Sequence, residues 1–157
     1  MKTINLNFPV SLDKNKVRIG AFFVFLFNII SIILFYLNPI ISLIITIIVW
    51  FDFLVVFIVG PKFSLFRFLI DWIHSNYIQK EEWISSKPKR FAKFCGLTLL
   101  SVSLVFYFYN ASIYLLLLCI LTLFSFLEFA FDFCVACKIY GILQKIGVIS
   151  QDHCENC

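Results

Sequence analysis

Four long apolar segments alternate with short polar stretches along the chain. A run of about 20 apolar residues, rising about 1.5 Å per residue, spans the roughly 30 Å hydrocarbon layer as a helix that satisfies its own backbone hydrogen bonds. The segments that reach this length are residues 19–37, 40–59, 91–109 and 112–133. The pattern predicts an all-α, polytopic membrane protein with four transmembrane helices.

The turns between these segments indicate how the helices pair. Only Asn38-Pro39 separates the first two segments, and only Asn110-Ala111 separates the last two. Because such short turns leave no room for a crossing connection, each pair is expected to form an antiparallel hairpin.

The central connection, residues 61–90, has an amphipathic pattern. Polar residues recur every three or four positions among aromatic and aliphatic ones: Ser64, Arg67, Asp71 and His74. We expect a helix lying in the cytoplasmic interface, with Trp72 and Trp83 at headgroup level, followed by a solvated loop.

The basic residues indicate the orientation. All 13 Lys and Arg residues lie before the first segment, between the second and the head of the third, or after the fourth, and none lies in the two short turns. The positive-inside rule then places both termini in the cytoplasm. The expected organisation is a cytoplasmic N-terminal segment (1–18), a transmembrane domain (19–137) and a cytoplasmic cysteine-containing tail (138–157).

Composition narrows the functional classes. Hydrophobic residues make up 62% of the 157 residues and charged residues 14%, against about 25% charged in soluble domains. The net charge of +4 does not indicate nucleic acid, because the basic residues flank apolar segments. The chain has no Gly-rich phosphate loop and no His-Glu-x-x-His motif, so the familiar nucleotide and hydrolase chemistries have no support.

Four of the six cysteines form two Cys-x-x-Cys pairs, Cys134 with Cys137 and Cys154 with Cys157, with His153 beside the second pair. The 16 residues between the pairs fit a zinc site, or a site for another soft metal such as copper or mercury. The same pairs fit a dithiol relay that works through mixed disulfides. Both interpretations remain open at this point, and the cofactor is unknown.

We expect the first pair at the cytoplasmic end of the fourth helix. The negative end of a helix dipole opposes thiolate formation there, and Lys138 partly offsets it. The predicted catalytic residues are Cys134, Cys137 and Lys138, with His153, Cys154 and Cys157 as a relay or metal site. The isolated Cys95 and Cys119 are interpreted as small buried hydrophobic residues.

Three carboxylates lie in or near the membrane: Asp52, Glu128 and Asp132. Burial of such groups is expensive, so they are functional candidates. Asp52 and Glu128 are expected at similar depth and facing each other, where they assist proton movement or bind a substrate. The alternative is hydrogen bonding between helices by protonated acids.

Several short segments together resemble a known bacterial membrane family, catalogued as domain of unknown function 4395. The resemblance covers about residues 13–145 and is strongest in Phe133-Cys134-Val135-Ala136-Cys137-Lys138-Ile139-Tyr140. The other matching positions are Asp52, Gly60, Pro61 and Arg90. The resemblance implies a bacterial cytoplasmic (inner) membrane location and thioredoxin-like or rhodanese-like partners. We therefore predict thiol-disulfide exchange or sulfur transfer at Cys134 and Cys137, with metal binding or transport as the alternative.

Overall fold

The computed structural model describes residues 11–60, 63–77 and 83–146. Four helices in this part of the chain are long and apolar enough to cross a membrane, which confirms the all-α class and the four membrane-length helices. They are α1 (Lys14–Leu37), α2 (Pro39–Ile58), α4 (Ser86–Tyr109) and α5 (Ala111–Phe131). The other described elements are shorter: α3 (Arg67–Tyr77), α6 (Val135–Lys145), β1 (Ser11–Asp13) and β2 (Trp83–Ser85).

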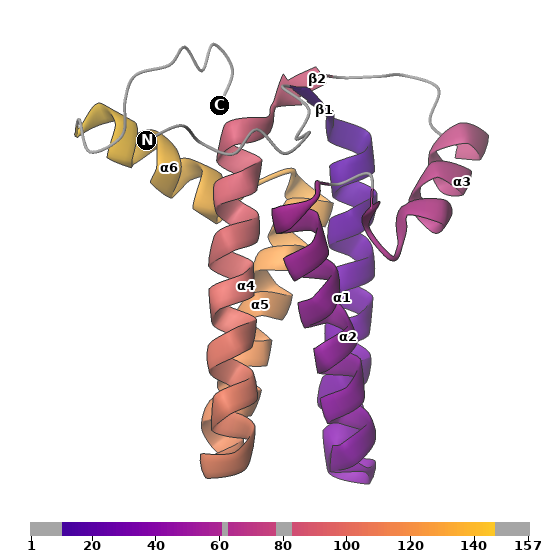
Figure 1. Cartoon of the computed structure of the whole chain (residues 1–157), viewed down its shortest axis with the longest axis vertical. Helices are drawn as coiled ribbons and strands as arrows, with labels where there is room; N and C mark the ends of the chain where they lie inside the picture. Colours follow the sequence, from indigo (N-terminus) through magenta and orange to yellow (C-terminus); the bar gives the residue numbers. More distant parts are fainter. Residues whose placement is uncertain (1–10, 61–62, 78–82, 147–157) are drawn as a thin grey trace.

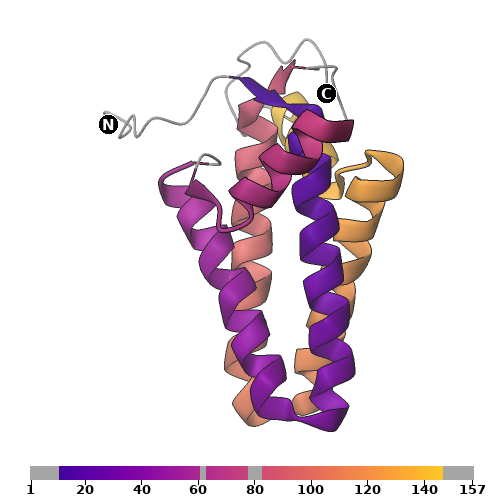
Figure 2. The same ribbon diagram turned by 90° about the vertical axis from the view of Figure 1, so that its right-hand side faces the viewer.

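The four long helices form a bundle (Figures 1 and 2). Helix α1 packs against α2 and α5, and α4 packs against the same two helices. Consequently α2 and α5 are diagonal to each other. The short helices α3 and α6 and both strands gather at one end of the bundle, which we call the α6 end (Figure 1).

An asparagine makes each tight turn at the opposite end. The Asn38 side chain accepts hydrogen bonds from the N–H groups of Ile40 and Ile41, at 3.2 and 3.4 Å. Asn110 accepts in the same way from Ser112 and Ile113, at 3.0 and 3.3 Å. Each asparagine has extended backbone and caps the N-terminus of the next helix, so one residue ends one helix and begins another.

The central connection differs from its prediction in two ways. Strand β2 pairs antiparallel with β1, with Leu12 opposite Ile84. Helix α4 begins at Ser86, five residues before the predicted start at Phe91. Basic residues in the first turns of α4 lower the local hydropathy, so the sequence pattern placed the start of the helix too late. Two of these residues lie over aromatic rings of α2. The Arg90 guanidinium is 5.6 Å from the Phe57 ring centroid, and Lys93 Nζ is 4.1 Å from that of Phe53.

Further contacts attach α3 to the bundle at the α6 end. Ile70 of α3 packs in a buried cluster with Ile19 and Phe23 of α1. His74 Nε2 lies 2.8 Å from Oδ2 of Asp13, whose Oδ1 caps α1 by accepting from the Asn15 N–H. Helix α3 is therefore held at its inner face, while its side chains Phe68, Leu69 and Trp72 are exposed.

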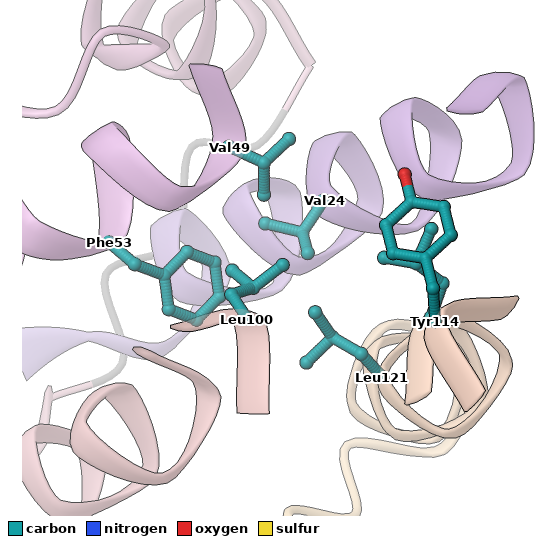
Figure 3. Packing of buried hydrophobic residues seen from close by; sticks show 7 residues of the cluster. Val24, Val49, Phe53, Leu100, Tyr114 and Leu121 are labelled. Atoms are coloured by element: carbon teal, nitrogen blue, oxygen red, sulfur yellow. The ribbon is translucent and has the colours of Figure 1, made fainter. Parts of the chain in front are cut away.

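The bundle interior is mainly apolar. Figure 3 shows buried residues contributed by all four long helices, among them Val24, Val49, Leu100 and Leu121. The small residue Gly96 brings α4 close to α2. A Cβ atom at Gly96 would lie 2.3 Å from Cε1 of Phe53, so this helix contact depends on the missing side chain.

A closed ring of four hydroxyl groups joins α1, α2 and α5 near the asparagine turns. Ser31 lies 2.9 Å from Ser42, Ser42 lies 3.0 Å from Tyr114, Tyr114 lies 2.9 Å from Thr46, and Thr46 lies 2.9 Å from Ser31. All four side chains are fully buried. The Ser31 and Thr46 hydroxyls also donate to the backbone carbonyl of Ser42, at 3.1 and 3.0 Å, so this carbonyl belongs to the same hydrogen-bond network.

Replacing Tyr114 with phenylalanine should destabilise the protein by about 1 kcal/mol, because two contacts of the ring are lost while the aromatic packing remains. The change is measured as unfolding in detergent micelles. Tyr36→Phe is the matched control, since the Tyr36 side chain is largely exposed. An equal effect of the two substitutions would contradict a stabilising role for the ring.

Candidate functional site: a dithiol beside a partly buried ion pair

The chain leaves α5 through a left-handed residue. Asp132 has φ 56° and ψ 25°, and the N–H groups of Asp132 and Phe133 both donate to the Leu127 carbonyl. Cys134 then has extended backbone and is the N-cap residue of α6. The expectation that the first cysteine pair ends the fourth helix is therefore wrong: α5 stops at Phe131, and the pair opens a new helix.

The position of the pair at the start of a helix reverses the expected effect of the helix dipole on the thiols. Cys134 is at the N-cap and Cys137 is in the first turn of α6, where the partial positive charge of the helix end favours a thiolate. The break was hidden in the sequence because neither Gly nor Pro occurs there; Asp132 takes the left-handed conformation that aspartate tolerates better than most residues.

A partly buried ion pair lies beside the two thiols. Lys89 Nζ of α4 lies 2.6 Å from Oε1 of Glu128 in α5, and the two side chains are only 13% and 20% exposed. Both residues interact electrostatically with Cys134 and Cys137. The dithiol, the lysine and the carboxylate thus form one cluster built from α4, α5 and the start of α6, which we call the dithiol cluster.

The two thiols of the cluster differ in acidity. The pKa of Cys134 is lowered, first by a hydrogen bond from the Cys137 thiol and also by the charge of Lys89, against burial and the Glu128 charge. The pKa of Cys137 is raised, first by its hydrogen bond to Cys134 and then by burial. Cys134 is therefore the more readily ionised thiol, and Cys137 keeps its proton. Both are free thiols of intermediate exposure.

The lysine in this cluster is not the one that the sequence indicated. Lys138 is exposed on α6 and is not among the groups that lower the pKa of Cys134, whereas Lys89 is. Sequence analysis missed this role of Lys89. A signal was present, because Lys89 and Glu128 lie at similar distances, 21 and 18 residues, on either side of the Asn110 turn.

The other two membrane carboxylates have partners of their own. Asp52 is buried, and its Oδ1 accepts from the Ser64 hydroxyl and the Leu65 N–H, both at 2.7 Å. It therefore anchors the segment that leads into α3. Asp52 and Glu128 were expected to face each other, but they bind these different partners from diagonal helices.

Asp132 combines its left-handed backbone with an ion pair to Lys14, at 2.7 Å. Asp132→Asn and Asp132→Gly should change stability by less than about 1 kcal/mol, because a partly exposed ion pair contributes little. Asp132→Val should destabilise by roughly 1–2 kcal/mol more, since a branched residue strains this conformation. Unfolding of the three variants in micelles tests this expectation. Equal stability of the valine and asparagine variants would contradict it.

The second cysteine pair and its neighbour, Cys154, Cys157 and His153, lie outside the described residues. Within residues 11–60, 63–77 and 83–146, no group of three or more His, Cys, Asp or Glu side chains is placed to hold a metal ion. Cys95 of α4 is near enough to Cys134 to interact with its charge, and Cys119 is exposed.

A comparison with protein-family models matches residues 12–145 to one described as Domain of unknown function (DUF4395). The chain belongs to this family. No curated protein and no solved structure matches it. The match to DUF4395 includes the whole dithiol cluster and ends before the second cysteine pair. The DUF4395 description names no activity, so a function must be argued from the cluster itself.

Proposed function

We propose that this DUF4395 protein carries out thiol-disulfide exchange at the membrane surface, with Cys134 as the attacking thiol. The observation that carries the proposal is the position of the pair at the start of α6 beside Lys89, where the Cys137 thiol, the lysine charge and the helix end all favour the Cys134 thiolate. The thiolate is the reactive form in disulfide exchange.

The reaction proceeds in two displacements. The Cys134 thiolate attacks one sulfur of a partner disulfide, forms a mixed disulfide, and releases the other partner sulfur as a thiolate. Cys137 then loses its proton and attacks the Cys134 sulfur, which releases the second partner sulfur. The partner disulfide is reduced to a dithiol, and Cys134 and Cys137 are oxidised to a disulfide.

The ion pair of Lys89 and Glu128 stabilises a charge and accepts a proton in this reaction. Lys89 stabilises the Cys134 thiolate at the start, and the Glu128 carboxylate receives the proton that Cys137 must lose before the second displacement. Asp52 serves a structural role at the start of α3. A soluble thioredoxin-like dithiol protein returns the disulfide to the reduced state.

We further propose two antiparallel hairpins with the α6 end in the cytoplasm of a bacterial cell. Support comes from the single-residue turns and from the basic residues, which in the described chain lie towards the α6 end. The exposed Phe68, Leu69 and Trp72 suit α3 to the interface. An impermeant maleimide added outside intact cells should leave Cys134 unlabelled and should label it after lysis; labelling from outside would invert this topology.

Trapping experiments test the exchange reaction. In full-length protein with Ser at positions 95, 119, 154 and 157, Cys137→Ser should accumulate a mixed disulfide at Cys134 with oxidised glutathione, because the resolving thiol is missing. Cys134→Ser, which is matched to it in size and chemistry, should form far less adduct at Cys137. Intact-protein mass spectrometry gives the yields. Equal yields, or stoichiometric zinc that is lost when Cys134 is replaced, would overturn the proposal.

A further inference from the structure

A cavity of about 340 Å³ lies along the outside of α1, between α3 and α5. It is unrelated to the dithiol cluster. Its lining residues are Asn15, Arg18, Ile19, Phe22, Ile73 and Phe129. Figure 2 shows α3 crossing α1 near the α6 end, and Ile73 of α3 is one of the residues that line the cavity.

The lining has a polar end and an apolar end. The residues contributed by α1 occur at positions 15, 18, 19 and 22, which lie on one face of a helix. Asn15 and Arg18 precede Ile19 and Phe22 along α1 and so lie nearer the α6 end, and the Phe22 ring is 4.8 Å from the ring of Phe129. A ligand that matches this sequence of polar and then apolar lining residues has a polar headgroup and a hydrocarbon chain.

Arg18 gives the polar end a positive charge. Its Nε and Nη2 atoms donate to the carbonyl of Phe129, at 3.3 and 3.1 Å. A neutral carbonyl fixes the guanidinium at the cavity rim without cancelling its charge, and Nη1 takes part in neither bond. The neighbouring lysines, in contrast, have carboxylate partners: Lys14 is paired with Asp132, and Lys16 is paired with Asp71.

The depth of the cavity in the membrane agrees with this chemistry. It lies within the first turns of the membrane-length helix α1 and beside α3, whose Phe68 and Trp72 are exposed as in interfacial helices. Basic pockets between membrane helices at the cytoplasmic side are typical sites for acidic lipid headgroups.

We propose that this cavity binds one anionic phospholipid. The lipid phosphate is held by Arg18, whose planar guanidinium suits phosphate oxygens, and an acyl chain follows Ile19, Phe22 and Phe129. Bound in this way, the lipid links α1, α3 and α5 at the membrane surface. The site does not depend on the thiol chemistry.

Native mass spectrometry of the full-length, delipidated protein tests the site, with phosphatidylglycerol and phosphatidylcholine as probes. We expect one tightly bound phosphatidylglycerol per chain and at least about tenfold weaker binding of phosphatidylcholine. Arg18→Gln should reduce this preference to about twofold or less. Lys145→Gln is the matched control, because it removes one exposed positive charge at the end of α6 and should leave the preference unchanged.

A second variant separates the cavity from general charge attraction. Ile73→Trp should fill the cavity from α3 and weaken phosphatidylglycerol binding while Arg18 is still present. An unchanged alkylation rate of Cys134 shows that these variants are folded. Equal binding of the two lipids by the unmodified protein, or full phosphatidylglycerol binding by folded Arg18→Gln, would overturn the proposal.

Discussion

Replacing Lys89 with methionine should raise the pKa of the Cys134 thiol and slow its alkylation at neutral pH. The lysine charge favours the thiolate, so its removal shifts ionisation to higher pH. Below the pKa, the thiolate fraction falls about tenfold for each unit by which the pKa rises. The rate of reaction of Cys134 with iodoacetamide is measured from pH 5 to 10 and gives the pKa directly, in protein that keeps Cys137 and has Ser at positions 95, 119, 154 and 157.

Replacing Glu128, the partner of Lys89, should shift the pKa of Cys134 in the opposite direction. Glu128→Gln removes a negative charge that raises the pKa of Cys134, so its alkylation should become faster at a given pH. Lys89→Met also leaves the partly buried Glu128 without its partner. The double variant removes this second effect and so tests whether Lys89→Met acts through the thiol alone. Lys138→Met should have no effect. Shifts of the same sign from both single substitutions would contradict the dithiol cluster.

Replacing Gly96 with alanine should destabilise the protein by roughly 1–3 kcal/mol, because a new methyl group must displace a packed ring. The Phe53 ring has little freedom to move, since Lys93 lies 4.1 Å from its centroid and the side chain is buried. Unfolding in detergent micelles, followed by circular dichroism, measures the change.

The chain offers a matched control for this substitution. A Cβ at Gly141 in α6 would meet nothing within 4 Å. Gly141→Ala should therefore stabilise α6 by about 0.5–1 kcal/mol through its higher helix propensity. Phe53→Leu should restore part of the stability that Gly96→Ala removes. Equal and small effects at the two glycines would show that α2 and α4 are not in close contact at Gly96.

The long-range features of the fold were readable in the sequence because they depend on extended patterns. A membrane crossing needs about 20 apolar residues, and a signal of that length survives local exceptions such as Asn28 or Asp52. The turns at Asn38 and Asn110 were also visible, because each polar residue interrupts a long apolar run.

The sequence did not predict those features of the fold that depend on only a few residues. The left-handed Asp132 ends α5 inside an apolar stretch, and this one residue decides whether Cys134 ends a helix or begins one. The three-residue strands β1 and β2 are too short for a periodic signal, and residues far apart in sequence form them. The ion pair of Lys89 with Glu128 likewise depends on how two helices dock. The candidate cysteines were found, but their electrostatic surroundings required the structure.

The pairing of β1 with β2 affects how the bundle can move. It connects the start of α1 directly to the start of α4, and Asp13 of the same strand also contacts α3 through His74. An alternating-access carrier opens by rocking its two halves apart at each face of the membrane in turn. Here both halves are tied together at the α6 end, so any large opening should occur at the asparagine turns instead. The strand pair therefore restricts the relative movement of α1 and α4 at the α6 end.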